Sequence, residues 1–197
     1  TLSAHKIGGP IGVGVLYVKQ GSPYHPLILG GHQENRRRAG TTNIIGIAGF
    51  GAAAAWCWDH WSCRKWAGVA KLRNELKQRI LQEIPYCTCN TPAEHSLPHI
   101  LNLSFAAAEG ESIQLYLSEQ GIYVGTGSAC AAGDLRPSHV IMATKHDAEI
   151  AHNSIRFALG LDTTEADIER VMQVLPPIIA RLRDMSTIKL GEKDVSI

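Results

Sequence analysis

Net charge and long hydrophobic runs are both nearly absent from this sequence. Its 197 residues carry 19 lysines and arginines against 18 aspartates and glutamates, a formal charge of +1. A dedicated binder of nucleic acid or of a membrane surface needs a strong basic excess, so this balance argues against both classes. The longest apolar stretch, residues 49–55, is alanine-rich and much shorter than the roughly 20 residues of a transmembrane helix. No signal peptide is recognisable.

Cysteine is present, but without the order that a disulfide framework or a metal site requires. The five cysteines are Cys57, Cys63, Cys87, Cys89 and Cys130. An odd number at irregular spacing argues against a disulfide framework and favours the reducing cytosol. Cys87 and Cys89 have the wrong spacing for a zinc site, and no second pair follows them. We expect both to be ordinary cysteines of a strand or loop.

Hydrophobic periodicity predicts an α/β protein. Runs typical of strands occupy residues 10–18, 100–105, 122–124 and 154–159. Helical spacing of apolar residues covers residues 43–84, 111–120 and 163–185. Pro85 should end the first of these helices, Gly121 should close the second, and Pro176–Pro177 should kink or divide the third.

The predicted elements divide into two parts. Residues 1–60 hold a strand and a polar loop, which are too few strands for a sheet. Residues 61–197 alternate helices and strands and could pack by themselves. The chain also begins at Thr1, without an initiator Met and within a group of chemically active residues, so we interpret it as a fragment of a larger enzyme.

The first group of candidate site residues is Ser3, His5 and Lys6. Lys6 lies just before a glycine-rich turn, where a semi-buried amine could lose its charge and form a Schiff base with a carbonyl. The neighbouring hydroxyl and imidazole suit a phosphate. Five preceding residues cannot build a pocket, so its other walls must come from elsewhere. The alternative is a surface turn with an ordinary lysine.

A second candidate is the polar loop over residues 23–42. Arg36, Arg37 and Arg38 repel one another unless an anion or a partner surface takes up their charge. Glycines let the backbone approach a phosphate, and Gly40–Thr41 adds an N–H and a hydroxyl. A solvated basic loop is the alternative interpretation.

Two single residues complete the candidates. Cys130 lies among small residues at 125–134, where an exposed, mobile loop and a nearby cation would favour the reactive thiolate. The alternative is a buried loop cysteine. Arg156 interrupts the apolar strand at 154–159 and so needs an anionic partner, which could be a substrate carboxylate or an internal salt bridge.

Taken in order, these motifs resemble the C-terminal half of a cysteine desulfurase of the NifS/IscS type, within the class V aminotransferase-like enzymes that use pyridoxal phosphate. The matching motifs are Ser-x-His-Lys at 3–6, Gly-Gly-x-Gln-Glu with Arg-x-Gly-Thr at 30–41, Gly-Ser-Ala-Cys at 127–130 and Ser-Ile-Arg-Phe-x-Leu-Gly at 154–160. The basic loop at residues 30–41 and the segment Leu-Pro-Pro-Ile-Ile-Ala-Arg-Leu-Arg at residues 175–183 are similar to those of the nitrogen-fixation branch of this family. Asn35–Arg36 departs from the Arg-Gly that is more usual in the family.

The resemblance implies roles toward the cofactor. Lys6 would carry pyridoxal phosphate as a Schiff base and then act as acid and base at the substrate. Ser3 and His5 would bind the cofactor phosphate. Thr41 would reach the phosphate of the neighbouring subunit's cofactor, which implies a homodimer.

It also implies roles toward the substrate. Arg156 would bind the carboxylate of L-cysteine. Cys130 would take the sulfur, which leaves L-alanine and a persulfide. The persulfide would pass to an iron–sulfur scaffold or another sulfur acceptor in the cytoplasm, with a possible transient contact of Cys130 to a cluster and no metal site of the chain's own.

The fold implied is that of a truncated fold type I pyridoxal-phosphate-dependent transferase. Residues 1–60 would be the remnant of the cofactor-binding large domain and its sheet, and residues 61–197 a complete small α+β domain. Trp56, Trp58, Trp61 and Trp66 would pack against the missing half or the dimer partner. The alternatives are a selenocysteine lyase, another class V enzyme, or a non-catalytic module that docks sulfur acceptors.

The resemblance generates a prediction about this chain alone. In the resembled family, the aspartate that pairs with the pyridine nitrogen and the histidine that stacks on the ring both precede the lysine, and the chain contains neither. We therefore expect negligible desulfurase activity from the 197-residue chain supplied with pyridoxal phosphate and L-cysteine. Sulfide and alanine release measures this, and robust turnover would contradict it.

Overall fold

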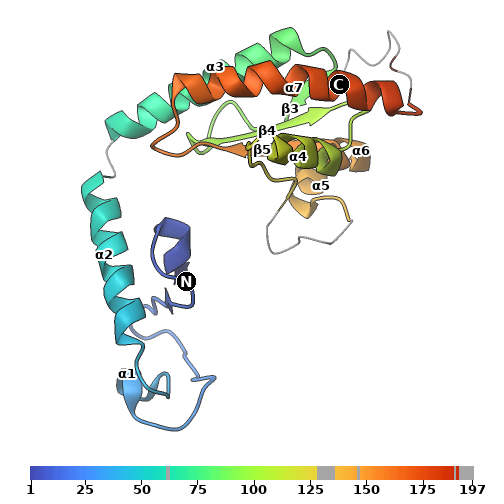
Figure 1. Cartoon of the computed structure of the whole chain (residues 1–197). Coiled ribbons are helices and arrows are strands. Elements are labelled where there is room, and N and C mark those ends of the chain that lie inside the picture. The colour runs from blue at the N-terminus through green and yellow to red at the C-terminus, as the bar shows by residue number, and fades with distance from the viewer. Residues whose placement is uncertain (61–62, 128–135, 146, 189, 191–197) are drawn as a thin grey trace. The chain divides into compact units, whose positions relative to one another are not determined.

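The computed structural model describes residues 1–60, 63–127, 136–145, 147–188 and 190 (Figure 1). Its internal contacts divide the chain into two compact units, Thr1–Ser62 and Cys63–Ile197. Each unit is described by itself. None of the helices in the described ranges is both long and apolar enough to cross a membrane.

The first unit begins with a tight antiparallel pairing around a 3-10 turn. Strand β1 (Leu2–Ser3) pairs with β2 (Gly14–Val15), and the 3-10 helix η1 (Ala4–Ile7) lies between them. The predicted buried strand over residues 10–18 is therefore wrong. Only two of its residues pair, because β1 offers only two partners, and Ile11 is 88% exposed.

Two helices complete the first unit. The short helix α1 (Gln33–Arg36) lies in the polar loop, and α2 (Ile44–His60) follows it. The Asn43 side chain accepts a hydrogen bond from the Gly46 N–H at 3.0 Å and so caps the start of α2. The helix is apolar, yet within its unit only Gly46 is buried, and Trp58 is 85% exposed.

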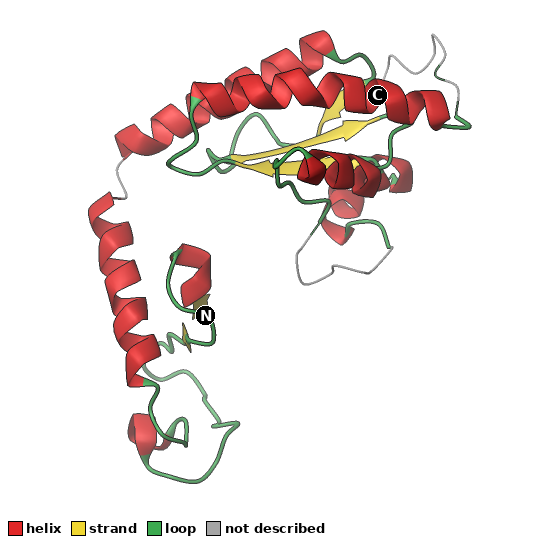
Figure 2. Ribbon diagram, viewed as in Figure 1, coloured by secondary structure: helices red, strands yellow, loops and turns green. Residues whose placement is uncertain are grey.

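The second unit is built on a three-stranded antiparallel sheet in the order β3–β4–β5 (Figure 2). Its strands are β3 (Cys87–Cys89), β4 (Ile100–Phe105) and β5 (Ser154–Ala158). The register sets Leu101 opposite Phe157 and Asn102 opposite Arg156. The predictions for β4 and β5 are confirmed, with one residue fewer at the end of β5.

Five helices accompany the sheet in the described part of the second unit. They are α3 (Cys63–Glu83), α4 (Gly110–Glu119), α5 (His139–Lys145), α6 (Ala148–His152) and α7 (Glu165–Met185). The sequence predicted α3, α4 and α7, and α3 ends before Pro85 as expected. It missed α5 and α6, which are too short to show a clear helical period. The predicted strand at 122–124 is wrong, because none of these residues pairs and only the next residue, Gly125, makes an isolated bridge, to Arg156.

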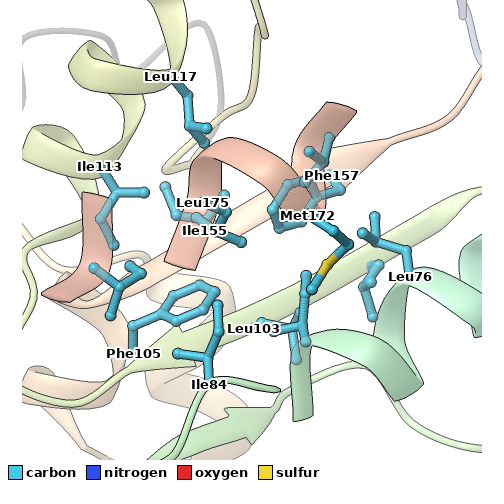
Figure 3. Packing of buried hydrophobic residues seen from close by; sticks show 14 of the residues in the cluster. Leu76, Ile84, Leu103, Phe105, Ile113, Leu117, Ile155, Phe157, Met172 and Leu175 are labelled. Atoms are coloured by element: carbon cyan, nitrogen blue, oxygen red, sulfur yellow. The ribbon is translucent and has the colours of Figure 1, made fainter. Parts of the chain in front are cut away.

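One hydrophobic core holds the sheet to α3, α4 and α7 (Figure 3). Alternate residues of β4, namely Leu101, Leu103 and Phe105, are fully buried in it, together with Leu76 of α3 and Leu175 of α7. Because side chains alternate between the two faces of a strand, the residues between them face away from this core. The sheet of the second unit therefore has one apolar face, which lies in the core, and a separate polar face.

Helix α7 shows how the sequence signals its own boundaries. Thr164 and Asp167 form a capping box, and the hydrogen bonds from Thr164 lower the pKa of Asp167. The helix then runs through Pro176 and Pro177 as one element, so the prolines do not divide it. Buried residues on both sides of the prolines, Leu175 and Ile179, anchor the helix to the core across this point.

Cys87, Cys89 and Trp66 of the second unit serve packing. Cys87 and Cys89 lie in β3 and pack against the core, and burial raises the pKa of the Cys87 thiol to about 12, which keeps it protonated. Trp66 also packs against this core, with its ring 5.0 Å from that of His99, so it does not face a missing partner. Trp56 and Trp58 are exposed within their unit, and Trp61 lies outside the described residues.

Near the end of α7, Arg183 joins three segments of the second unit. Its guanidinium donates to the carbonyl oxygens of Ala106 at 3.0 Å, Pro85 at 2.8 Å and Tyr86 at 3.3 Å. These carbonyls belong to the turn after α3 and to the segment after β4. One side chain thus ties the last helix to two connections of the sheet.

We expect Arg183→Met to lower the free energy of unfolding by about 2 kcal/mol, because partly buried carbonyls lose charged donors while the apolar stem is kept. Arg170→Met is the matched control, since Arg170 makes one exposed hydrogen bond, to Gln120, and should change stability far less. Urea denaturation of both variants measures this. Equal losses in the two variants would show that the three carbonyl contacts contribute little.

Candidate functional site

The turn that carries Lys6 is fixed by its backbone. The Ala4 N–H donates to the Val13 carbonyl at 3.1 Å, and the Gly9 N–H donates to the Ala4 carbonyl at 2.9 Å. Gly8 closes η1 with a φ of 81°, a left-handed conformation that glycine adopts without strain. Ala4 is fully buried, so the small residue in the middle of the motif anchors the turn.

The functional side chains of this turn all point outward within their unit. Ser3, His5 and Lys6 are exposed, so the expectation of a semi-buried Lys6 is wrong for the described chain. The physical reason is that η1 is a single turn that buries only Ala4. Wherever Lys6 meets a pocket, surfaces outside this turn must form it.

The donor set on the turn fits a phosphorylated aldehyde. The Ser3 hydroxyl makes no capping hydrogen bond, and among the described residues no hydrogen bond or ion pair engages Ser3, His5 or Lys6 through its side chain. A primary amine can condense with an aldehyde, and a hydroxyl and an imidazole can bind a phosphate. Pyridoxal phosphate carries both groups, so the residues present fit it.

The predicted polar loop is held by its own hydrogen bonds. The Ala39 N–H donates to the Ile28 carbonyl at 3.2 Å, and the Tyr24 hydroxyl donates to the Arg37 carbonyl at 2.8 Å. Thr41 follows this loop in the same unit as Lys6, with an exposed side chain. The loop also lines an open cavity of about 330 Å³, formed by Ile28, Leu29, Gly30, Gly31, His32 and Arg36.

Backbone strain is concentrated in the middle of this loop. Glu34, Asn35 and Arg36 have φ values of 48°, 54° and 64°, in the left-handed region that residues with a Cβ avoid. Arg37 returns to an ordinary right-handed conformation, with a φ of −92°. The segment that departs from the family pattern, Asn35–Arg36, is therefore also the segment where glycine would fit best.

Arg156 lies in β5, on the polar face of the sheet. Its neighbours Ile155 and Phe157 are buried in the core, so its own side chain points the other way. Its backbone exchanges two hydrogen bonds with Gly125, at 3.1 Å and 2.6 Å, and a Cβ on Gly125 would lie 3.1 Å from the guanidinium. In the described ranges no carboxylate pairs with Arg156, so the internal salt bridge is not found there.

The candidate residues are distributed over both units. Ser3, His5, Lys6 and Thr41 belong to the first unit, and Arg156 belongs to the second. Cys130 lies outside the described residues.

The sequence analysis missed the polar side chains that share the sheet face with Arg156. These are Asn90, Asn102 and Ser104. The alternation Leu-Asn-Leu-Ser-Phe at 101–105 could have revealed the last two, since it sets two polar residues opposite the apolar face.

Comparisons with known proteins agree with one another. The model of the family described as aminotransferase class-V matches residues 1–171. A cysteine desulfurase of Trichormus azollae is 45% identical over 194 residues, which is 98% of this chain and 48% of that protein. The cysteine desulfurase IscS of Dictyoglomus turgidum is 44% identical over 189 residues, or 96% of this chain and 48% of that protein. The chain thus spans about half the length of the curated relatives it matches.

Solved structures show the same relationship. A NifS-like protein superposes with a TM-score of 0.74 at 33% identity, covering 93% of this chain and 44% of its own. The NifS-like protein of Rickettsia africae gives a TM-score of 0.68 at 28% identity, covering 79% of this chain and 40% of its own. The likeness therefore extends from sequence to fold.

The left-handed backbone of the polar loop makes a prediction. We expect Arg36→Gly to raise the free energy of unfolding by about 0.5–1 kcal/mol, because glycine accepts the positive φ without strain. Arg37→Gly removes the same charge at a right-handed residue and should lower stability by a similar amount, through the greater entropy of the unfolded chain. Chemical denaturation of the pair measures the difference, and equal shifts would contradict this account.

Proposed function

Because the family model covers residues 1–171, the chain belongs to the class V aminotransferase family, and we propose that it carries part of the active site of a cysteine desulfurase. In this proposal, L-cysteine gives up its sulfur to Cys130, and L-alanine is released. The relatives that support this proposal are about twice as long as the chain, so the proposal concerns the whole protein.

The observation that carries the proposal is the outward-facing trio of Ser3, His5 and Lys6, which leaves an amine and two phosphate donors unpaired among the described residues. When bound, pyridoxal phosphate supplies an electron sink for the substrate's α-carbon. The Ser3 hydroxyl and His5 imidazole hold the phosphate, and Thr41 does so for the neighbouring subunit of a homodimer. The Lys6 amine holds the aldehyde carbon and later moves the proton at the α-carbon.

Substrate binding and sulfur transfer fall to the second unit. The Arg156 guanidinium binds the carboxylate of L-cysteine, since a planar fork of donors matches the two carboxylate oxygens. The Cys130 thiolate attacks the substrate sulfur, the carbon–sulfur bond breaks, and a sulfur–sulfur bond forms. The β-carbon gains a proton, so one cysteine and one thiol become one alanine and one persulfide.

The two units take different parts in this proposal. Residues 1–60 belong to the cofactor-binding large domain, and residues 61–197 form the small domain. The persulfide is delivered to an iron–sulfur scaffold or another acceptor protein in the cytoplasm, with a role in nitrogen fixation favoured by the sequence of the polar loop and of α7. The IscS name of one relative supports the iron–sulfur assignment.

The proposal predicts two chemical signatures of the cofactor and one of the sulfur step in the complete enzyme. Pyridoxal phosphate should produce a visible absorbance band and, after borohydride reduction, a stable adduct on Lys6. Lys6→Ala should abolish both signatures, whereas Lys19→Ala, a matched exposed lysine of the same unit, should keep them. After treatment with L-cysteine, mass spectrometry should find an extra sulfur on Cys130.

The controls for the sulfur step follow the same logic. Cys130→Ser should lose persulfide and sulfur delivery, and Cys57→Ser should retain both. Full sulfur delivery by Cys130→Ser would overturn the assignment of the sulfur carrier. Binding of an acceptor without any absorbance band would instead favour the non-catalytic docking module.

A further inference from the structure

Asn102 lies next to Arg156 on the polar face of the sheet. The register pairs the two residues directly across β4 and β5. The Arg156 N–H and carbonyl both bond to Gly125, on the side away from β4, so Asn102 and Arg156 form a non-hydrogen-bonded pair. In such antiparallel pairs the Cα atoms are only about 4.5 Å apart and the side chains approach most closely.

A chain of hydrogen bonds fixes which way the Asn102 side-chain amide is turned. The Ser104 hydroxyl donates its single proton to the Ile150 carbonyl at 2.8 Å, so it can only accept from Asn90, whose Nδ2 lies 2.7 Å away. The same Asn90 Nδ2 donates to the Asn102 Oδ1 at 2.7 Å. Because Asn102 must present its oxygen to Asn90, its Nδ2 group is left over.

The leftover donor has no acceptor. Among the described residues no hydrogen bond engages the Asn102 Nδ2, and none engages the Arg156 guanidinium. Both side chains are half-buried and on one face. Two neighbouring groups of donors, one of them charged, suit an anion that accepts from both.

The orientation of the Asn90 side-chain amide is also energetically unfavourable. The Asn90 Oδ1 is buried without a partner in the described part of the chain. Turning this amide would place its oxygen against the Ser104 oxygen, which has no proton to give. A buried polar atom left without a partner needs an explanation, and here the arrangement keeps the Asn102 nitrogen free.

We infer that Asn102 is a second binding residue for the substrate carboxylate, donating from Nδ2 beside the Arg156 guanidinium. Asn90 and Ser104 act as positioning residues that set the orientation of the Asn102 amide. The inference rests on the proposed function, since it concerns the carboxylate that Arg156 binds there. It assigns recognition of an α-amino acid carboxylate to the Arg156 guanidinium and the Asn102 side-chain amide, which lie on adjacent strands.

The test uses the pyridoxal-phosphate-loaded holoenzyme and two probes, L-alanine and L-cysteine. Dissociation constants for L-alanine come from the absorbance change on titration, and KM and kcat for L-cysteine from alanine release. Asn102→Asp keeps the acceptor for Asn90 but replaces the donor with a negative charge beside Arg156. We expect it to weaken L-alanine binding and raise KM by more than about tenfold, with kcat changed much less.

Two further variants make the result decisive. Asn102→Ala removes the donor without adding charge and should weaken binding by about three- to tenfold, which also covers the case in which the Asp variant fails to fold. Thr88→Asp adds the same charge on the same sheet face, on β3, away from Arg156, and should bind both probes as the wild type does.

The outcomes separate the two proposals. If the wild type binds L-alanine and converts L-cysteine while the Asn102 variants bind within twofold of it, the inference is overturned and the proposed function stands. An effect of Thr88→Asp equal to that of Asn102→Asp would also overturn the inference. The cause would then be the electrostatic field of any added negative charge on this face, and not the loss of the Asn102 donor. If the wild type itself neither binds L-alanine nor forms a persulfide, the proposed function fails.

Discussion

The register between β4 and β5 is the constraint on which the second unit depends. Pairing Leu101 with Phe157 and Leu103 with Ile155 sends four large apolar side chains into the core. The same pairing sends Asn102 to the opposite face, beside Arg156. A slip of one residue would exchange the two faces, exposing the core side chains and burying the arginine. The core and the proposed carboxylate site therefore depend on the same register of β4 and β5.

Much of this unit could be predicted from the sequence, because its signals are local and strong. Alternation at 100–105 and the stop at Pro85 each act within one element, and the structure has them as expected. The apolar spacing of α7 predicts a buried stripe at residues 168, 171, 175, 178 and 182. Four of these are buried, but Ile179 rather than Ile178 is fully buried. Such errors arise because the sequence gives the period of a helix more firmly than its exact rotation.

The failures have a different physical origin. The strand expected at 10–18 has suitable residues, but strand formation requires a partner, and the sequence of one segment does not state how long its partner is. The brief strand at 122–124 fails for the same reason, with only Gly125 pairing with β5. The network of Asn90, Asn102 and Ser104 was also missed, because it depends on pairing between residues far apart in the chain. Motifs identified the chemical groups, and only the register identified their neighbours.

The two units place their functional groups on very different foundations. Arg156 lies on a sheet backed by a large core, so its position is determined within the described residues of its own unit. Lys6 lies on a single turn anchored by Ala4, in a unit whose long helix leaves Ile44, Ile45 and Trp58 exposed. Exposed apolar residues gathered on one helix are typical of a surface that contacts other polypeptide. The geometry around Lys6 and Thr41 is thus set by that contact as much as by their own segments. In the proposed function, folding alone fixes the carboxylate site and assembly completes the cofactor site, so loss of assembly should remove cofactor binding before it disturbs the fold around Arg156.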